Sequence, residues 1–151
     1  MMIDGVKVKP LRVVPNEQGC LVELLRADDE IYIKFGQLNL NTLYPRVIKA
    51  WHYHLKQWTH LLVIRGMVKL VLYDGRDDSP TRGQLDEWFI GDWNQKLVQV
   101  PPGVYYGLMC LSQTEALVIS VMSEPYNYDD PDEFHLDRQS SAISYVWNQA
   151  E

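Results

Sequence analysis

The segment Trp58-Thr-His-Leu-Leu-Val-Ile-Arg-Gly-Met-Val-Lys-Leu-Val-Leu-Tyr73 contains two apolar runs that meet at Gly66. Short runs of β-branched and other large apolar residues, bounded by a glycine, are typical of strands. They predict strands at 58–64 and 67–73, and the glycine between them predicts a tight hairpin. The segment therefore indicates antiparallel β structure.

Similar short runs occur along most of the chain, separated by turn residues such as Gly, Pro, Asn and Asp. They predict eight more strands, at 6–14, 20–25, 35–42, 48–54, 87–90, 97–100, 105–110 and 115–121. Ten short strands at close spacing predict an all-β fold, a closed or double-sheet jelly-roll barrel. We expect residues 1–151 to form a single domain.

Two segments between or after these runs are polar. The stretch 124–133 is acidic and broken by prolines, which predicts a short irregular C-terminal arm, with a short helix in 123–133 as the alternative. The run at 74–78, which includes Arg76, is interpreted as a solvated loop. His135 follows the arm in a polar tail, and we assign it no function.

Composition and charge exclude several classes of protein. The 151 residues are 46% hydrophobic and 23% charged, as in globular domains, and the formal net charge is −6. A net negative charge disfavours nucleic acid and anionic membranes as partners. No apolar run reaches the roughly 18 residues of a membrane span, and the N-terminus lacks a signal-peptide pattern. We therefore expect a cytoplasmic protein with Cys20 and Cys110 as reduced, buried thiols, and a single disulfide bridge between them is the alternative.

The segment Lys49-Ala-Trp-His-Tyr-His54 carries the clearest candidate for chemistry. Side chains at i and i+2 of a strand lie on one face, so His52 and His54 point the same way, and Trp51 and Tyr53 point the other way. Two imidazoles inside a barrel are suited either to metal binding or to proton transfer. The alternative is that both histidines have only structural roles.

This segment resembles the first cupin motif, in which His-x-His is followed by a glutamate, and Pro101-Pro-Gly103 resembles the start of the second. The resemblance puts Thr59 at the glutamate position and Tyr106 at the position of the last histidine. Two of four metal ligands are then missing, and His60 lies on the opposite strand face from Thr59. We therefore expect a cupin barrel without its metal, because two histidines alone hold a divalent cation weakly.

From Asn16 to Trp147 the chain is similar to the dTDP-4-dehydrorhamnose 3,5-epimerase family of the cupin superfamily. The motifs that carry the resemblance are Gln18-Gly19 followed by Glu23, Gln37-x-Asn39, Lys49-Ala-Trp-His52-Tyr, Val63-Ile-Arg-Gly66, Tyr73-Asp-Gly-Arg76, Asp78-Ser-Pro-Thr81, Val100-Pro-Pro-Gly-Val104 and Ile143-Ser-Tyr-Val-Trp147. It implies a cupin-type double-stranded β-helix. It also implies an isomerase of deoxysugar and polysaccharide biosynthesis, a metal-independent epimerase that needs no cofactor and acts on a nucleotide-linked 4-keto-6-deoxy sugar.

The resemblance also implies roles for individual residues. His52 stands at the position of the family's general base, and Asp137 is the candidate for the aspartate that orients it. Several family residues are absent: Thr59 replaces the enolate-stabilising lysine, and no tyrosine lies near 119–121. Tyr106 is a candidate to supply or remove a proton, or alternatively an interior tyrosine bonded to the backbone. The candidates for substrate binding are Glu23, Gln37, Asn39, Lys49, His54, Thr59, Tyr126 and Tyr128, although packing of the arm is an alternative role for the two tyrosines.

Two other functions fit the same residues. One is a nucleotide-sugar 3,4-ketoisomerase, which uses the same enediol chemistry. The other is a non-catalytic cupin that binds a sugar or a small metabolite, which the missing lysine and tyrosine favour. Because the family pairs its barrels, we expect a homodimer, with the strand at 6–14 as a candidate for exchange between protomers.

Overall fold

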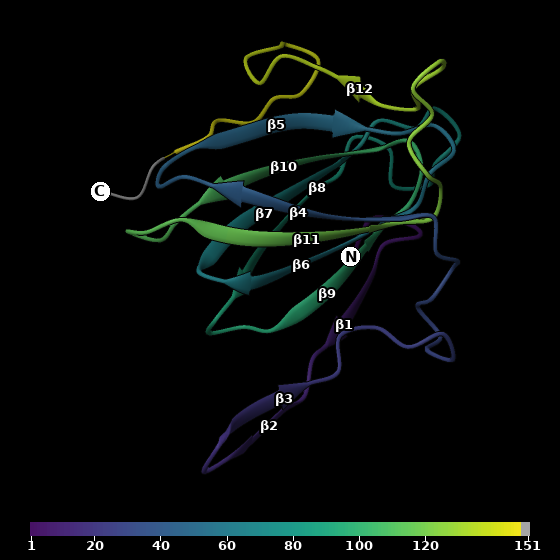
Figure 1. The fold of residues 1–151 in the computed structure, drawn as a ribbon. Coiled ribbons are helices and arrows are strands. Elements are labelled where there is room, and N and C mark those ends of the chain that lie inside the picture. The colour runs from purple at the N-terminus through teal and green to yellow at the C-terminus, as the bar shows by residue number, and fades with distance from the viewer. Residues whose placement is uncertain (149–151) are drawn as a thin grey trace.

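The computed structural model describes residues 1–148, and in them the chain forms twelve β-strands and no helix (Figure 1). No segment of this described part is a helix that could span a membrane. The strands are β1 (Lys7–Pro10), β2 (Val13–Asn16), β3 (Gly19–Val22), β4 (Gln37–Leu43), β5 (Ile48–Tyr53), β6 (Thr59–Arg65), β7 (Met67–Asp74), β8 (Leu85–Gly91), β9 (Lys96–Val100), β10 (Val104–Cys110), β11 (Ala116–Met122) and β12 (Phe134–His135).

Two five-stranded antiparallel sheets pack face to face and form the barrel (Figure 1). One sheet has the order β1-β9-β6-β11-β4, and the other has the order β12-β5-β10-β7-β8. The hairpin of β2 and β3 pairs only with itself and projects away from both sheets. Apolar side chains of the two sheets, such as Leu43, Leu70, Val98 and Val118, are fully buried between them. The predicted jelly-roll barrel is confirmed.

The chain between β6 and β7 differs from the prediction. Gly66 does sit at the bend, with a φ of 85°, but β6 and β7 belong to different sheets, so the predicted hairpin is wrong. A Cβ atom at Gly66 would lie 3.1 Å from the Cα of Ala116, so a side chain has little room. Alternate residues of both strands are buried in the same core, so the two runs pack face to face instead of pairing edge to edge.

Three smaller points also need correction. The strand expected at 6–14 is two strands, β1 and β2, in different sheets. Cys20 is exposed because it lies on the projecting hairpin, whereas Cys110 is buried as expected. The arm at 124–133 is irregular as predicted, with no helix, but the short strand β12 that follows it was missed. It was missed because β12 has only two residues and forms solely by pairing with β5.

The run at 74–78 begins with a buried carboxylate, not a solvated loop. Asp74 is fully buried and accepts hydrogen bonds from the Arg76 guanidinium (2.9 Å), the Ser79 hydroxyl (2.5 Å) and the Thr81 hydroxyl (2.6 Å). We call these four residues the Asp74 cluster. Burial alone would raise the pKa of Asp74, but the hydrogen bonds from Arg76, Ser79 and Thr81 outweigh it and hold the pKa well below its usual value.

The outer face of β5 is covered by the C-terminal segment. Trp51 is fully buried there, with ring centroids 5.3 Å from Trp147 and 5.9 Å from Tyr145. A Cβ atom at Gly107 would lie 2.5 Å from the Trp147 ring, so the absence of a side chain lets the indole lie against β10. These contacts agree with the expectation that Trp51 faces away from His52.

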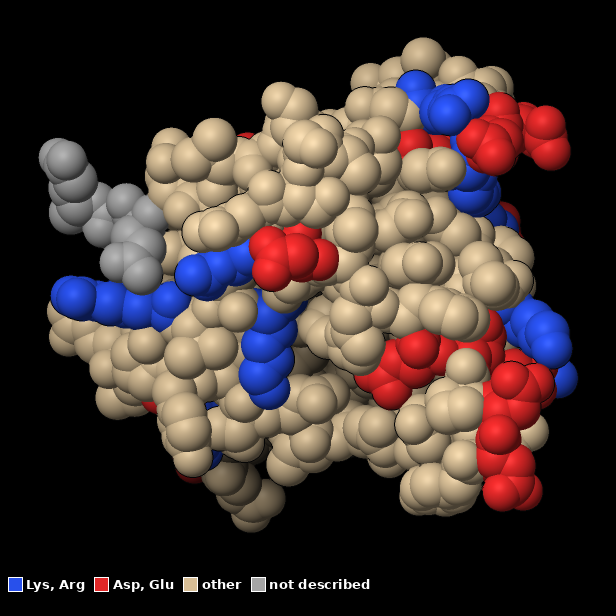
Figure 2. Space-filling model, turned by 90° about the horizontal axis from the view of Figure 1, so that it is seen from above, with Lys and Arg blue, Asp and Glu red and all other residues tan. Residues whose placement is uncertain are grey.

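Seen from above, basic and acidic side chains form small separate groups among uncharged residues (Figure 2).

Candidate active site

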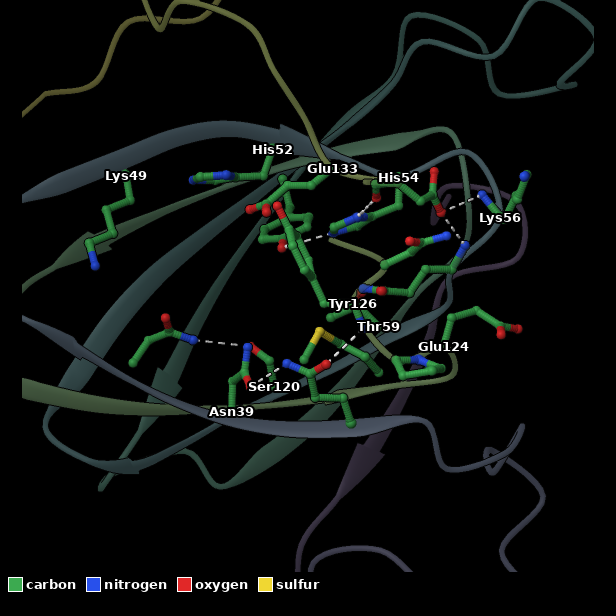
Figure 3. Close-up of a pocket in the computed structure, with 18 of the residues that line it drawn as sticks. Asn39, Lys49, His52, His54, Lys56, Thr59, Ser120, Glu124, Tyr126 and Glu133 are labelled. Carbon is green, nitrogen blue, oxygen red and sulfur yellow. Dashed lines mark hydrogen bonds between the residues drawn. The ribbon is translucent and has the colours of Figure 1, made fainter. Parts of the chain in front are cut away.

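A cavity of about 620 Å³ lies between the two sheets at one end of the barrel. Its two walls are the inner faces of β5 and β10 and the inner faces of β4 and β11, and part of the arm closes its side (Figure 3). Polar side chains line much of the wall formed by β4 and β11. They are Gln37, Asn39, Asn41 and Ser120. Amides and hydroxyls in such a cleft are suited to binding a polyhydroxylated small molecule.

His52 lies in the middle of one row of side chains that crosses the sheet. In strand register it is opposite Tyr106 of β10 and opposite His135 of β12, so all three side chains point to the same face. The ring centroids of His52 and Tyr106 are 5.6 Å apart, and those of His52 and His135 are 4.6 Å apart. The register therefore surrounds His52 with groups that can carry or transfer a proton.

The His52 imidazole is neutral at pH 7. Burial, and to a smaller extent the positive charges that His135, His54 and Lys49 can carry, lower its pKa to about 4. None of the hydrogen bonds in the described part of the chain involves the His52 ring, so its ring nitrogens are left for a ligand. A neutral, accessible imidazole is the form in which histidine accepts a proton.

His54 and Tyr106 form a second, linked pair. The Nδ1 atom of His54 lies 2.5 Å from the carbonyl oxygen of Asp132, which can only accept, so Nδ1 carries the ring proton. The unprotonated Nε2 atom then lies 3.4 Å from the Tyr106 hydroxyl and can accept from it. Burial, together with the charge of Glu133, raises the pKa of Tyr106 well above its usual value. Tyr106 is therefore a protonated phenol that faces the cavity.

Asp132 fixes the arm over the cavity. Its carboxylate accepts hydrogen bonds from the backbone N–H groups of Leu55, Lys56 and Gln57 at 2.8 to 3.0 Å. Burial alone would raise the pKa of the Asp132 carboxyl, but the three backbone hydrogen bonds outweigh burial and lower that pKa below its usual value. At the other end of the arm, the backbone N–H of Tyr126 donates to Gln37 Oε1 at 2.8 Å. The arm is thus an ordered wall of the site.

The structure brings together most of the residues that the sequence singled out. His52, Tyr106, Gln37, Asn39, Lys49, His54, Thr59 and Tyr126 all line the cavity. The Thr59 hydroxyl accepts from Gln57 Nε2 at 3.0 Å and keeps its own proton to donate. His60 lies on the opposite face of β6, as expected, and its Nε2 atom bonds the Ile31 carbonyl oxygen at 2.7 Å.

Three predicted residues lie outside the cavity of their own chain. Asp137 accepts a hydrogen bond from the Gln139 backbone N–H at 2.8 Å in an exposed turn. Glu23 is exposed and forms an ion pair with Arg26 at 3.5 Å. Tyr128 is 86% exposed and lies against the Tyr126 ring, at 4.9 Å between centroids. The roles assigned to these three residues stay predictions.

The sequence reasoning missed Glu133 and His135. The alternation Glu133-Phe134-His135 repeats the pattern that identified His52 and His54, because residues i and i+2 share a face of a strand. That signal was available, but it depended on recognising a two-residue strand in a polar tail. Glu133 lines the cavity, and His135 lies directly beside His52.

The fold and the site together define a class of protein. A jelly-roll barrel whose cavity holds a neutral imidazole next to a protonated phenol is an enzyme of the cupin type, equipped to move protons on a small polar substrate.

The chain belongs to the dTDP-4-dehydrorhamnose 3,5-epimerase family, whose family model matches residues 1–151. It is 40% identical over 147 residues to the spore coat polysaccharide biosynthesis protein SpsL of Bacillus subtilis, covering 97% of each chain. It is 36% identical to a Haloferax volcanii protein named "Probable low-salt glycan biosynthesis epimerase", covering 97% of this chain and 95% of that one. The crystal structure of a dTDP sugar isomerase from Desulfovibrio desulfuricans superposes with a TM-score of 0.91 at 31% identity, covering 99% of this chain and 94% of the other. These findings confirm the predicted family and the predicted class, a sugar epimerase and hence an isomerase.

Proposed function

We propose that this protein epimerises a nucleotide-linked 4-keto-6-deoxy sugar without a metal, with His52 as general base and Tyr106 as general acid. One observation carries the assignment: a neutral His52, whose ring has no hydrogen bond to any other described residue, lies 5.6 Å, between centroids, from a protonated Tyr106 inside the same cavity. Membership of the family supports the substrate class. The similarity to a polysaccharide biosynthesis protein supports a place in glycan assembly.

The reaction begins with a carbon acid. The ketone at C4 acidifies the hydrogens on C3 and C5, and His52 removes one of them as a proton, which leaves an enolate. Return of a proton from the Tyr106 hydroxyl to the opposite face of that carbon inverts its configuration. The cycle closes when the His52 imidazolium loses its proton to solvent and the Tyr106 phenolate regains one from solvent. His54 Nε2 accepts from Tyr106 in the resting state and so holds the phenol toward the cavity.

The enolate oxygen needs a partner in place of the family's lysine. Thr59 occupies that position in the sequence, and its hydroxyl is buried in the cavity wall with a proton free to donate. A preorganised neutral donor in a water-poor site can stabilise a developing oxyanion. Lys49 also lines the cavity and supplies a positive charge for the anionic part of a nucleotide sugar.

The test is solvent exchange on dTDP-4-keto-6-deoxyglucose in D₂O. We expect deuterium to enter at C3 or C5, measured by NMR, and we expect His52→Ala to abolish this exchange. Asp129→Asn, on the exposed side of the arm and outside the cavity, is the matched control and is expected to exchange as the native protein does. Movement of the ketone from C4 to C3 without inversion would indicate a ketoisomerase, and tight binding without exchange would indicate a non-catalytic cupin. Either result would contradict the proposal.

We also propose that the protein is a cytoplasmic homodimer. The β2–β3 hairpin exposes Val13, Val14 and Leu21, and an isolated two-stranded ribbon is at best marginally stable in water. The outer face of β4 exposes Leu38 and Leu40 at 56% and 58%, at the edge of its sheet. Exchange of the hairpin would bury such surfaces and would carry Glu23, which follows β3, toward the partner subunit. Light scattering after size exclusion tests this, since a mass of one chain would contradict it.

A further inference from the structure

Three side chains that could bind a metal converge beside the cavity. His135 lies opposite His52 in the β12–β5 register, and Glu133 lies two residues before His135, so all three point to one face. One nitrogen from each imidazole and one Glu133 carboxylate oxygen lie within 4.8 Å of one another. The His135 Nε2 to Glu133 Oε1 distance is 3.7 Å. Three donors of these types in one place are a candidate transition-metal site.

The backbone that carries these donors is held on both sides. Leu136 and Trp51 exchange two backbone hydrogen bonds, at 2.9 and 3.0 Å, immediately after His135 and immediately before His52. Phe134, on the opposite face, stacks on Tyr53 with centroids 5.3 Å apart and planes 23° apart. Asp132, just before Glu133, is bound to three backbone N–H groups of the loop after β5. These contacts restrain the backbone on both sides of the donors, which favours a preorganised site.

The donor set indicates the kind of ion. Zn²⁺ takes imidazole nitrogen and carboxylate oxygen at about 2.0–2.2 Å, with tetrahedral geometry, which places its ligand atoms roughly 3.4 Å apart. The three candidate ligand atoms here lie within 4.8 Å of one another, so they must come closer together to hold the ion. Mg²⁺ and Ca²⁺ prefer all-oxygen sites and do not suit two imidazoles. Three protein ligands would leave one coordination position open on the ion.

We propose that His52, Glu133 and His135 bind one Zn²⁺ ion, and that the bound ion withdraws His52 from proton transfer and inhibits the enzyme. This site differs from a cupin metal centre, because it uses neither the Thr59 nor the Tyr106 position and takes two ligands from β12 and the residue before it. The binding stands on geometry alone. The inhibition rests on the proposed function, in which His52 is the base.

Binding is tested first on the native protein, stripped with EDTA and exchanged into chelator-free buffer. Titration with Zn²⁺ against a chromogenic chelator is expected to show one saturable site per chain, unaffected by excess Mg²⁺. Glu133→Gln and His135→Gln are each expected to weaken zinc affinity at least about ten-fold. Asp129→Asn, on the same arm, is the matched control and is expected to retain native affinity. Among the described residues the Glu133 carboxylate pairs with His135, outside the backbone of β12, so its substitution tests the site even if His135→Gln disturbs β12.

The absence of a saturable site, or affinity that survives both substitutions, would overturn the proposal. Inhibition is tested by deuterium exchange into the sugar in D₂O. We expect exchange to fall in proportion to zinc occupancy, to return with EDTA, and to resist zinc in Glu133→Gln. Zinc that binds without slowing exchange would overturn the inhibitory role. Zinc that binds to a stripped enzyme showing no exchange at all would support the site and contradict the proposed function instead.

Discussion

The cavity and the Asp74 cluster are both polar regions of the same barrel, but their side chains are bonded very differently. In the Asp74 cluster every carboxylate oxygen has partners, from a guanidinium and two hydroxyls, at 2.9 Å or less. In the cavity the His52 ring has only ring contacts among the described residues, and Tyr106 has a single long bond of 3.4 Å.

This difference in hydrogen bonding distinguishes polar groups that stabilise the fold from polar groups that can react with a ligand. A buried charge whose hydrogen-bonding capacity is filled holds loops together and has nothing left for a ligand. A polar group lined up in a cavity without partners lowers stability slightly, yet it can bind a substrate or exchange a proton. Both regions lie in motifs that carry the family resemblance, so motif content alone does not distinguish them.

The largest expected effect comes from His52→Ala. General base catalysis contributes roughly 10²- to 10⁴-fold, so deuterium exchange should fall by about 10³-fold or more. The free energy of unfolding should change by about 1 kcal/mol or less, because the ring makes no hydrogen bond to the rest of the described chain. Mass spectrometry of exchanged sugar and urea denaturation measure the two quantities. A large loss of stability would place His52 with the structural residues.

Asp74→Asn should have the reverse pattern. The substitution removes the charge that pairs with Arg76 inside the protein, and breaking such buried pairs costs about 3–5 kcal/mol. We expect a loss near 3 kcal/mol in the free energy of unfolding, measured by urea denaturation at pH 7. Exchange per folded molecule should stay at the native rate, because the cluster lies outside the cavity. A slowed exchange in folded protein would remove the distinction between the regions.

Tyr106→Phe is expected to have the next largest effect. Loss of the proposed acid should slow exchange by about 10²-fold, because reprotonation would then depend on water. Stability should change little, since only the 3.4 Å bond to His54 is lost. Comparing rates with native protein and with Asp129→Asn provides the control. Native exchange in Tyr106→Phe would show that the proton returns from another group.

The smallest effect is a change of stability with pH. The folded pKa of Asp74 lies below its unfolded value of about 3.9, so its contribution is complete above that pH and is lost as pH falls further. The native protein should therefore lose its advantage over Asp74→Asn by about 1.4 kcal/mol per pH unit below pH 3.9. Urea denaturation at pH 7, 3.5 and 2.5 measures this. A constant gap would mean that the Asp74 charge contributes nothing.

Much of the fold could be predicted from the sequence, because the alternation of residues in a strand and the residues of a turn are local patterns. The ten apolar runs, the inward His52 and His54 and the outward Trp51 follow from the two-residue period alone. The two-residue period does not determine which strands pair with each other. Gly66 has the sequence of a hairpin bend, but β6 pairs with β9 and β11 whereas β7 pairs with β8 and β10, so the two strands lie in separate sheets.

The sequence predicted most of the site residues that lie on strands, but it predicted few of those that lie on irregular segments of the chain. Gln37, Asn39 and Thr59 line the cavity because their strand parity and sheet are fixed. Asp137 was chosen from a loose correspondence in the tail, but the residue that the register places beside His52 is His135. The position of that tail depends on the Asp132 hydrogen bonds and on packing over Trp51, which no local pattern encodes.

The interleaving of the two sheets has a consequence for how the protein folds. In β4 and β11 the paired residues are as far apart in sequence as Gln37 and Met122, and β1 pairs with β9 across a similar span. Long loops must close before such contacts form, and proteins dominated by them fold in milliseconds to seconds. Neither half of the chain can build a complete sheet alone. The cavity, which needs β4, β5, β10 and β11 together, therefore forms late, and a newly made chain has no binding site until nearly all of it has folded.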